Sequence, residues 1–257
     1  MNARVRRAVR ASALVGGALV AATVLTGCGT ANAEDATPED RTFSISGKQL
    51  TVDSDNSAIE LVPVAKDGKD IKVTRWFDGW TLGGSAGVSW EMRGDTLKLR
   101  LKCSGISVGC EAKHRIEVPR GVSVKVDDAN GEIKARGFET PLTIRTDNGG
   151  IDVRDSNGAL ELETSNGEIT AEGVGAPRVK ARSSNGRIAI GATKAPESVD
   201  AETDNGDVRV TLPLTGYKVD ARSDSGGVKV GVPRDDASGH SVRARSHNGE
   251  VSVRAAG

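Results

Sequence analysis

Aromatic residues are scarce in this sequence: they make up 3% of the 257 residues, while glycine numbers 32. A conventional globular core usually contains more large rings. Valine, isoleucine and leucine recur instead with a period of two, as strands with one buried face require. The composition therefore predicts an all-β protein with many short strands around a narrow interior.

Net charge is also absent, since 35 lysines and arginines balance 35 aspartates and glutamates. Four of the arginines lie within the first ten residues, so the rest of the chain is slightly acidic. A nucleic-acid-binding surface would need an excess of basic residues. We therefore expect no nucleic acid partner.

Histidine and cysteine are each present only three times. Cys103 and Cys110 lack histidines at the spacing of a zinc site, and we predict neither a metal nor a cofactor. Outside the cytoplasm these two cysteines most simply form a disulfide that closes a small loop. Two free thiols are the alternative.

The first 27 residues have the layout of a signal peptide. Four arginines precede an uncharged segment, residues 11–27, that is rich in alanine, valine and leucine. This segment is shorter than the run of about 20 apolar residues that spans a bilayer, and it contains Gly16 and Gly17. A cleaved signal is therefore favoured over a permanent membrane helix.

The segment ends in Leu25-Thr26-Gly27-Cys28, which resembles the lipobox of bacterial lipoproteins. The resemblance implies that a lipid is attached to the Cys28 thiol and that a peptidase cuts before this residue. Two acyl chains give stable anchoring, whereas a single chain is marginal. We therefore predict a palmitate-type anchor on Cys28 at the extracytoplasmic face of the cell membrane. An ordinary secretory signal is the alternative.

A turn written Asn-Gly recurs along the chain at short and regular intervals. In one copy serine replaces the asparagine, and in the first copy Ser57 replaces the glycine, so the turn positions are Asn56, Asn130, Asn148, Asn166, Asn185, Asn205, Ser225 and Asn248. In every copy the residues six and four before the turn position, and three and five after it, are apolar. The pattern predicts a repeated unit of strand, turn and strand, in which the turn needs residues with positive φ.

Charges distinguish two architectures for these repeats. Three residues before the turn, the sign alternates through six copies: Asp127, Arg145, Glu163, Arg182, Glu202 and Arg222. Opposite charges on neighbouring strands are favourable, so the alternation predicts a β-solenoid in which each repeat stacks on the one before. Two neighbours in such a stack, Asp200 with Asp220 and Arg222 with Arg245, do not fit. An antiparallel hairpin sandwich stays the alternative.

The domain organisation follows from these patterns. Residues 1–27 are the signal peptide, residues 28–41 are a polar and flexible tether, and residues 42–257 are the β-repeat domain. An irregular insertion at about residues 62–119 interrupts the repeats and contains four of the seven aromatic residues: Trp76, Phe77, Trp80 and Trp90. The insertion either caps one end of the stack or presents an aromatic patch to a glycan or protein partner.

Three motifs suggest a family. Residues 164–169 (TSNGEI), 203–208 (TDNGDV) and 246–251 (SHNGEV) resemble the signature of bacterial proteins named putative adhesins, a β-strand-repeat domain of otherwise unknown function. The resemblance extends from about Thr42 to the C-terminus. Members of that family are often surface lipoproteins or membrane-attached. The resemblance implies no catalytic or binding residues.

The sequence therefore predicts a non-enzymatic, adhesin-like or structural module of the cell envelope, with an unidentified envelope glycan or protein as partner. The segment Asp224-Ser225-Gly226-Gly227 is similar to the nucleophile region of trypsin-like proteases, but Ser225 already occupies a turn position. Carboxylate pairs such as Glu161 and Glu163 leave a second hypothesis open. It is a β-helix protein that binds or processes polysaccharides.

Overall fold

The computed structural model describes Ala33 and residues 36–257. The predicted signal peptide and the predicted lipid site at Cys28 lie outside the described residues. The described part is an all-β structure of 21 strands without an α-helix. None of its segments forms a helix that is long and apolar enough to cross a membrane.

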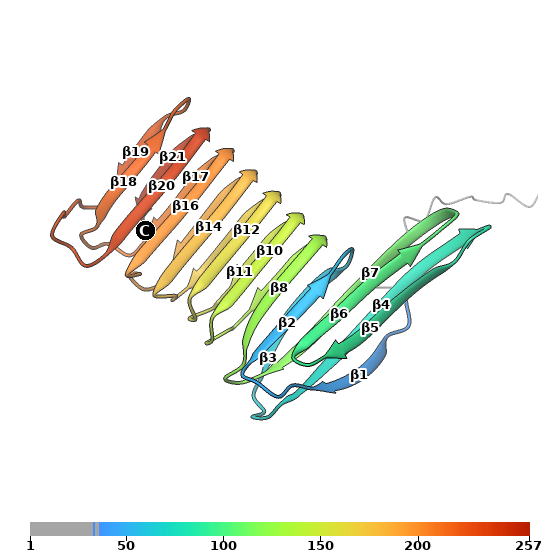
Figure 1. Cartoon of the computed structure of the whole chain (residues 1–257). Coiled ribbons are helices and arrows are strands. Elements are labelled where there is room, and N and C mark those ends of the chain that lie inside the picture. Colours follow the sequence, from blue (N-terminus) through green and yellow to red (C-terminus); the bar gives the residue numbers. More distant parts are fainter. Residues whose placement is uncertain (1–32, 34–35) are drawn as a thin grey trace, which may run out of the picture. The chain divides into compact units, whose positions relative to one another are not determined.

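Two sheets, both mostly parallel, build the stack (Figure 1). The ten-stranded sheet contains, in spatial order, β18 (Lys218–Ser223), β20 (Ser241–Asn248), β16 (Ser198–Asn205), β14 (Arg178–Asn185), β12 (Leu160–Asn166), β10 (Leu142–Asn148), β8 (Ser123–Asn130), β2 (Gln49–Ser54), β6 (Thr96–Cys103) and β5 (Ala86–Arg93). The eleven-stranded sheet contains β1 (Glu39–Ser44), β4 (Asp70–Leu82), β7 (Ile106–Pro119), β3 (Ala58–Val64), β9 (Ile133–Arg136), β11 (Ile151–Arg154), β13 (Ile169–Val174), β15 (Ile188–Ala192), β17 (Val208–Leu212), β21 (Val251–Ala255) and β19 (Val228–Gly231). Strand structure therefore begins at Glu39, shortly before the predicted domain start at Thr42.

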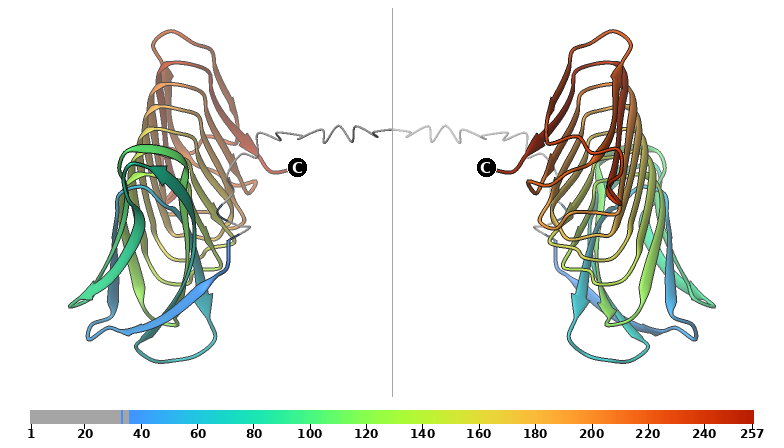
Figure 2. Two further views of the ribbon diagram at one scale, coloured as in Figure 1. Left: turned by 90° about the vertical axis from the view of Figure 1, so that its right-hand side faces the viewer. Right: turned by 90° about the vertical axis from the view of Figure 1, so that its left-hand side faces the viewer.

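Each repeat forms one coil, with the strand before the turn in one sheet and the strand after it in the other. Equivalent positions of neighbouring coils pair in parallel register, as Leu142 does with Leu160 and Asn166 with Asn185. Seen from the two ends, successive coils overlie one another (Figure 2). The predicted β-solenoid is confirmed. The hairpin sandwich is wrong, because strands joined as hairpins would pair antiparallel.

The apolar positions of the repeats line the interior between the two sheets. In seven of the eight copies these side chains are at most 3% exposed. Because the sheets face each other closely, Val, Ile, Leu and Ala fill the space, and large rings are not needed there. The burial of this apolar area, at about 25 cal/mol per Å², is the main favourable term that holds the coils together.

Most of the turns differ from the expectation of positive φ, which only two of the turn glycines, Gly206 and Gly249, meet. Among the described residues the only non-glycine residue with a clearly left-handed φ is Asp155, which is not a turn position. The turn glycines have another reason: a Cβ on Gly149 would lie 1.9 Å from the carbonyl oxygen of Gly131 in the neighbouring coil. A Cβ on Gly167 would lie 2.0 Å from the oxygen of Gly149. Glycine is therefore required by the close approach of stacked backbones.

The turn asparagines form a hydrogen-bonded column along one edge of the stack. From the second coil onward, each side-chain Nδ2 donates to the Oδ1 of the asparagine in the adjacent coil over 2.8–3.0 Å, and the column joins Asn56, Asn130, Asn148, Asn166, Asn185, Asn205 and Asn248. An amide can donate and accept at once, so one residue type satisfies both neighbours. Ser225 occupies the turn of the outermost coil.

The last two repeats stack in reverse order. β20 and β21, which come last in the sequence, lie between the β16–β17 coil and the β18–β19 coil. Arg243 therefore separates Asp200 from Asp220, which a consecutive stack would place side by side. Arg222 does lie beside Arg245, and Asp220 contacts both, at 2.8 and 2.6 Å. The expectation of a consecutive order is wrong at this end.

The insertion at about residues 62–119, which was expected to be irregular, contains one regular coil and an antiparallel cover. β6 and β7 stack in parallel on β2 and β3 as one more coil. β4, β5 and β1 then pair antiparallel on the outside. This end of the stack is therefore covered. The opposite end is open, and Val228 of its terminal coil is 44% exposed, although its equivalents in the other repeats are buried.

Candidate functional site

A projecting arm distinguishes the capped end from the regular stack. Four residues lie between Ser54 and Ile59, whereas fourteen lie between their strand partners Leu99 and His114. The additional residues extend β6 and β7 beyond the column of turns, and β4 and β5 pair with them along their length. We name residues 77–89 and 100–112 the arm.

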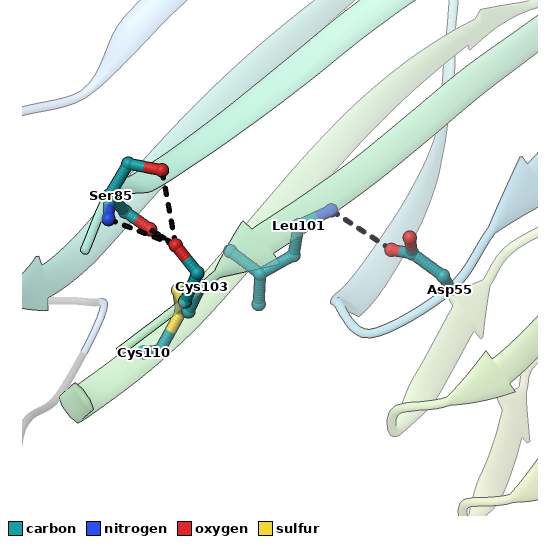
Figure 3. The surroundings of a disulfide bond; sticks show 6 residues. Asp55, Ser85, Leu101, Cys103 and Cys110 are labelled. Carbon is teal, nitrogen blue, oxygen red and sulfur yellow. Dashed lines mark hydrogen bonds between the residues drawn. A yellow bond between two sulfur atoms is a disulfide. The ribbon is translucent and has the colours of Figure 1, made fainter. Parts of the chain in front are cut away.

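The far end of the arm is fastened by a disulfide and by two interlocked turns. Cys103 on β6 and Cys110 on β7 form the predicted disulfide, which joins the two sheets (Figure 3). Beside it, the Ser104 amide donates to the Ser85 carbonyl at 2.9 Å, and the Ser85 amide donates to Ser104 Oγ at 3.0 Å. A Cβ on Gly84 would lie 1.9 Å from the Ser104 carbonyl oxygen, so the turns pack closely.

The four aromatic residues of the insertion divide between two faces. Side chains alternate along β4, and the buried residues Ile71 and Val73 mark the inner face. Phe77 shares this inner face and is half-buried, whereas Trp76 and Trp80 face outward. The predicted group of four is therefore not one patch.

Trp90 belongs to the cap. Its ring packs edge-on against Phe43 at 6.2 Å between centroids, and the Arg75 guanidinium lies 4.2 Å above it. Arg75 also donates to the Val88 carbonyl at 2.9 Å and pairs with Glu39. These contacts cover the end of the interior, as the cap hypothesis requires.

His114 lies under the same cluster and has no solvent-exposed surface. Burial, together with the charge of Arg75, lowers the pKa of its imidazole to about 4. The ring is therefore neutral at physiological pH. Its environment is apolar, with Trp90 at 6.5 Å between ring centroids.

The outer face of the arm ends in exposed apolar side chains. Trp80 is 60% exposed, Leu82 59% and Ile106 69%. Trp80 and Leu82 are two residues apart on β4, and Leu82 pairs directly with Ile106 across the ladder, so all three lie on one face. We name these three residues the apolar tip. Sequence periodicity missed Leu82 and Ile106, because single apolar residues in a strand are equally consistent with a buried face.

The outward charges of the coils pair between neighbouring strands. Arg145 Nε lies 3.2 Å from Glu163 Oε2, and Lys180 Nζ lies 2.9 Å from Glu161 Oε1. The Lys180 hydrogen bond lowers the pKa of Glu161. A general acid in glycoside hydrolysis needs a raised pKa instead. These carboxylates therefore belong to a row of paired charges that runs along the stack, which we name the charge column.

One histidine and one aspartate meet near the end of the stack. His247 Nδ1 lies 2.8 Å from Asp224 Oδ2, and both side chains are mostly exposed. The neighbouring hydroxyls of Ser223 and Ser246 donate to backbone carbonyls. The sequence did not predict this pair, because it joins two different repeats. Within the described part of the chain no group of three or more His, Cys, Asp or Glu side chains could hold a metal ion.

The structure also contains a buried carboxyl group that the sequence analysis did not predict. Asp128 occupies the position two before the turn, which is serine or threonine in all the other repeats. There the hydroxyl mostly donates to a carbonyl of the adjacent coil, as Thr164 does to Gly149 at 3.0 Å. Asp128 is 7% exposed, and burial, with the charges of Asp55 and Asp147, raises its pKa to about 6. Its departure from the hydroxyl column is the sequence signal for this group.

Several solved structures are similar to this chain. A protein described as a putative adhesin from Bacteroides fragilis is 15% identical, with a TM-score of 0.44, and the match covers 86% of this chain and 97% of that one. A putative cell adhesion protein from Clostridium sporogenes is 12% identical, with a TM-score of 0.35, over 86% of this chain and 100% of that one. A putative adhesin from Parabacteroides distasonis is 14% identical, with a TM-score of 0.31, over 85% and 98%.

Among curated proteins, none matches this chain. The family comparison gives a match over residues 44–256, which includes the regular coils, the reversed last two repeats and the insertion with its arm. This range extends over most of the sequence. The chain belongs to the Toastrack DUF4097 family.

Proposed function

We propose that this protein is a non-enzymatic, adhesin-like interaction module, anchored by lipid on Cys28 at the extracytoplasmic face of the cell membrane. The observation that carries the proposal is the apolar tip, which presents Trp80, Leu82 and Ile106 to solvent on a disulfide-fastened arm. Exposed clusters of this kind on a rigid support are typical of interaction sites. The names of the similar structures, putative adhesins, agree with this class of function.

The stack supports the same proposal. Its backbone hydrogen bonds, asparagine column and paired charges fix the coils to one another. Such a structure is suited to holding a contact surface in place. The outward carboxylates that sequence reasoning considered for catalysis have cationic partners between strands.

The lipid anchor is tested in cells that express the full-length protein. Radiolabelled palmitate is expected to label the membrane-bound protein, and Cys28→Ser is expected to abolish both the label and the membrane association. Cys110→Ala serves as a control, since its thiol is used in the disulfide. A soluble, unlabelled wild-type protein would contradict the anchor.

A polysaccharide partner is the second candidate, because Trp76 and Trp80 both face outward on the insertion. Binding of the mature protein to purified envelope glycans is measured by calorimetry, with Trp76→Ala and Trp80→Ala as test variants. Trp90→Phe is the matched control, since Trp90 packs in the cap. Incubation with the same glycans, with and without calcium, tests processing. Measurable turnover would contradict the non-enzymatic proposal.

A further inference from the structure

We infer that the apolar tip of the arm inserts into the outer surface of the bilayer that holds the Cys28 lipid. The inference rests on the proposed lipid anchor for the nearness of the membrane. It assigns the contact partner of the arm: a lipid bilayer surface.

The chemistry of the tip suits a membrane surface. Tryptophan is favoured at the boundary between headgroups and acyl chains, and leucine and isoleucine partition into the acyl region. Trp80, Leu82 and Ile106 lie on one face at the end of the arm, so they can enter a bilayer together. Next to the tip in the β4–β7 ladder, Asp78 lies opposite Glu111. These two acidic side chains limit the insertion of the arm to the headgroup region of the bilayer.

Ala33, the first described residue, lies near the arm. Ala33 is 5% exposed and lines a hollow of about 320 Å³ together with Leu101 and Cys110. Cys28 precedes Ala33 by five residues, which span at most about 18 Å when fully extended. Ile106 lies four residues from Cys110 along β7, or about 13 Å. The lipid and the tip therefore belong to the same end of the domain, within reach of one surface.

The rigidity of the arm determines the effect of a membrane contact at its tip. The Cys103–Cys110 disulfide and the hydrogen-bonded turns at Ser85 and Ser104 tie the two sheets of the arm together. A lipid on a polar segment fixes distance but not direction. A second contact at a stiff tip fixes direction as well.

The test uses the mature lipidated protein in vesicles of phosphatidylethanolamine and phosphatidylglycerol with brominated acyl chains, which quench tryptophan fluorescence on contact. The chain has three tryptophans. We expect quenching that Trp80→Phe largely removes. Trp76→Phe is the matched control, because Trp76 lies on the same strand, on the far side of Asp78 from the tip, and it is expected to leave the quenching in place. Absence of quenching, or quenching that survives Trp80→Phe, overturns the inference.

A second measurement separates the tip from the anchor. The mature chain, residues 28–257 with Cys28→Ser, is added to the same vesicles, and the combined Leu82→Ser and Ile106→Ser changes are expected to weaken its binding at least about tenfold. Leu214→Ser is the control, since Leu214 is 73% exposed outside the arm. Palmitate labelling without tryptophan quenching contradicts the membrane insertion of the apolar tip and supports the lipid anchor. Vesicle binding through the tip without palmitate labelling contradicts the lipid anchor and supports the insertion of the tip.

Discussion

At the residue scale, the turn glycines show that a repeated sequence motif can have a different cause from the usual one. Asn-Gly is a common hairpin turn, in which both residues need a positive φ. Here the asparagine joins a side-chain column, and the glycine makes room for the backbone of the next coil. The motif predicted the position of each turn but not the reason for its residues.

Gly149→Ala tests this reason. Its Cβ would lie 1.9 Å from a backbone oxygen, which cannot move without shifting a neighbouring coil, so we expect a loss of stability on the order of 3 kcal/mol. Gly150→Ala is a control in the same turn, because the nearest atom to its Cβ is 3.7 Å away. Urea denaturation measures both. Equal effects at the two glycines would show that backbone approach is not the cause.

Asp128 predicts a pH dependence of stability. Its pKa is about 6 in the folded protein and about 3.9 in an unfolded chain, so folding favours the neutral acid. The contribution of this group is full below about pH 4 and is lost as the pH rises to about 6, on the order of 3 kcal/mol in total. Denaturation between pH 4 and pH 8 measures it. Stability that is independent of Asp128 over this range would contradict the prediction.

Asp128→Thr is expected to remove this dependence and to stabilise the protein at pH 7.5. A threonine hydroxyl can donate to the Ser57 carbonyl, as Thr164 does to Gly149. The control is Asp127→Thr, on the outward face, where the carboxylate pairs with Lys125 at 2.6 Å. That variant is expected to bring no gain at pH 7.5.

At the element scale, the alternating charges on neighbouring strands predicted the parallel stack. The same charges also indicate the order in which the coils stack. Asp200 and Asp220 look incompatible in a consecutive stack. The column becomes alternating once Arg243 lies between them. The sequence therefore held a signal for the reversed order, but it could be interpreted only after the neighbours were known.

Arg182→Glu tests the charge column. The change places three acids on neighbouring strands, at positions 163, 182 and 202, and removes the contact of Arg182 with Asp200 at 3.2 Å. Because these side chains are partly exposed, we expect a loss of no more than about 1 kcal/mol, which salt reduces. Adding Glu163→Arg to Arg182→Glu is expected not to restore it, because two arginines, at positions 145 and 163, then lie on neighbouring strands. Thermal melts at low and high salt that show no effect of either variant would remove the support for the column.

At the scale of the whole molecule, the reversed order makes the last repeat an internal part of the stack. A chain that ends at Gly239 lacks β20 and β21, so the β18–β19 coil loses its neighbour and the β16–β17 coil is uncovered. We expect this truncation to be less stable, with proteolysis between residues 214 and 239. The longer truncation at Pro213 removes both coils and is expected to resist proteolysis better. If the chain that ends at Gly239 proves the more resistant, the reversed order is wrong.

The sequence by itself determined the coil: the period-two apolar positions specify which side chains face inward, and the regular turns specify the register. It also limited a disulfide within the domain to one pairing, Cys103 with Cys110, which the structure contains. The tertiary structure alone decided which coils are neighbours, why the turns need glycine, and which aromatic rings are exposed. The physical reason is that equivalent coils have the same faces, so the choice among them depends on long-range packing. The backbone approach at Gly149 and the exposure of Trp80 exist only after that choice is made.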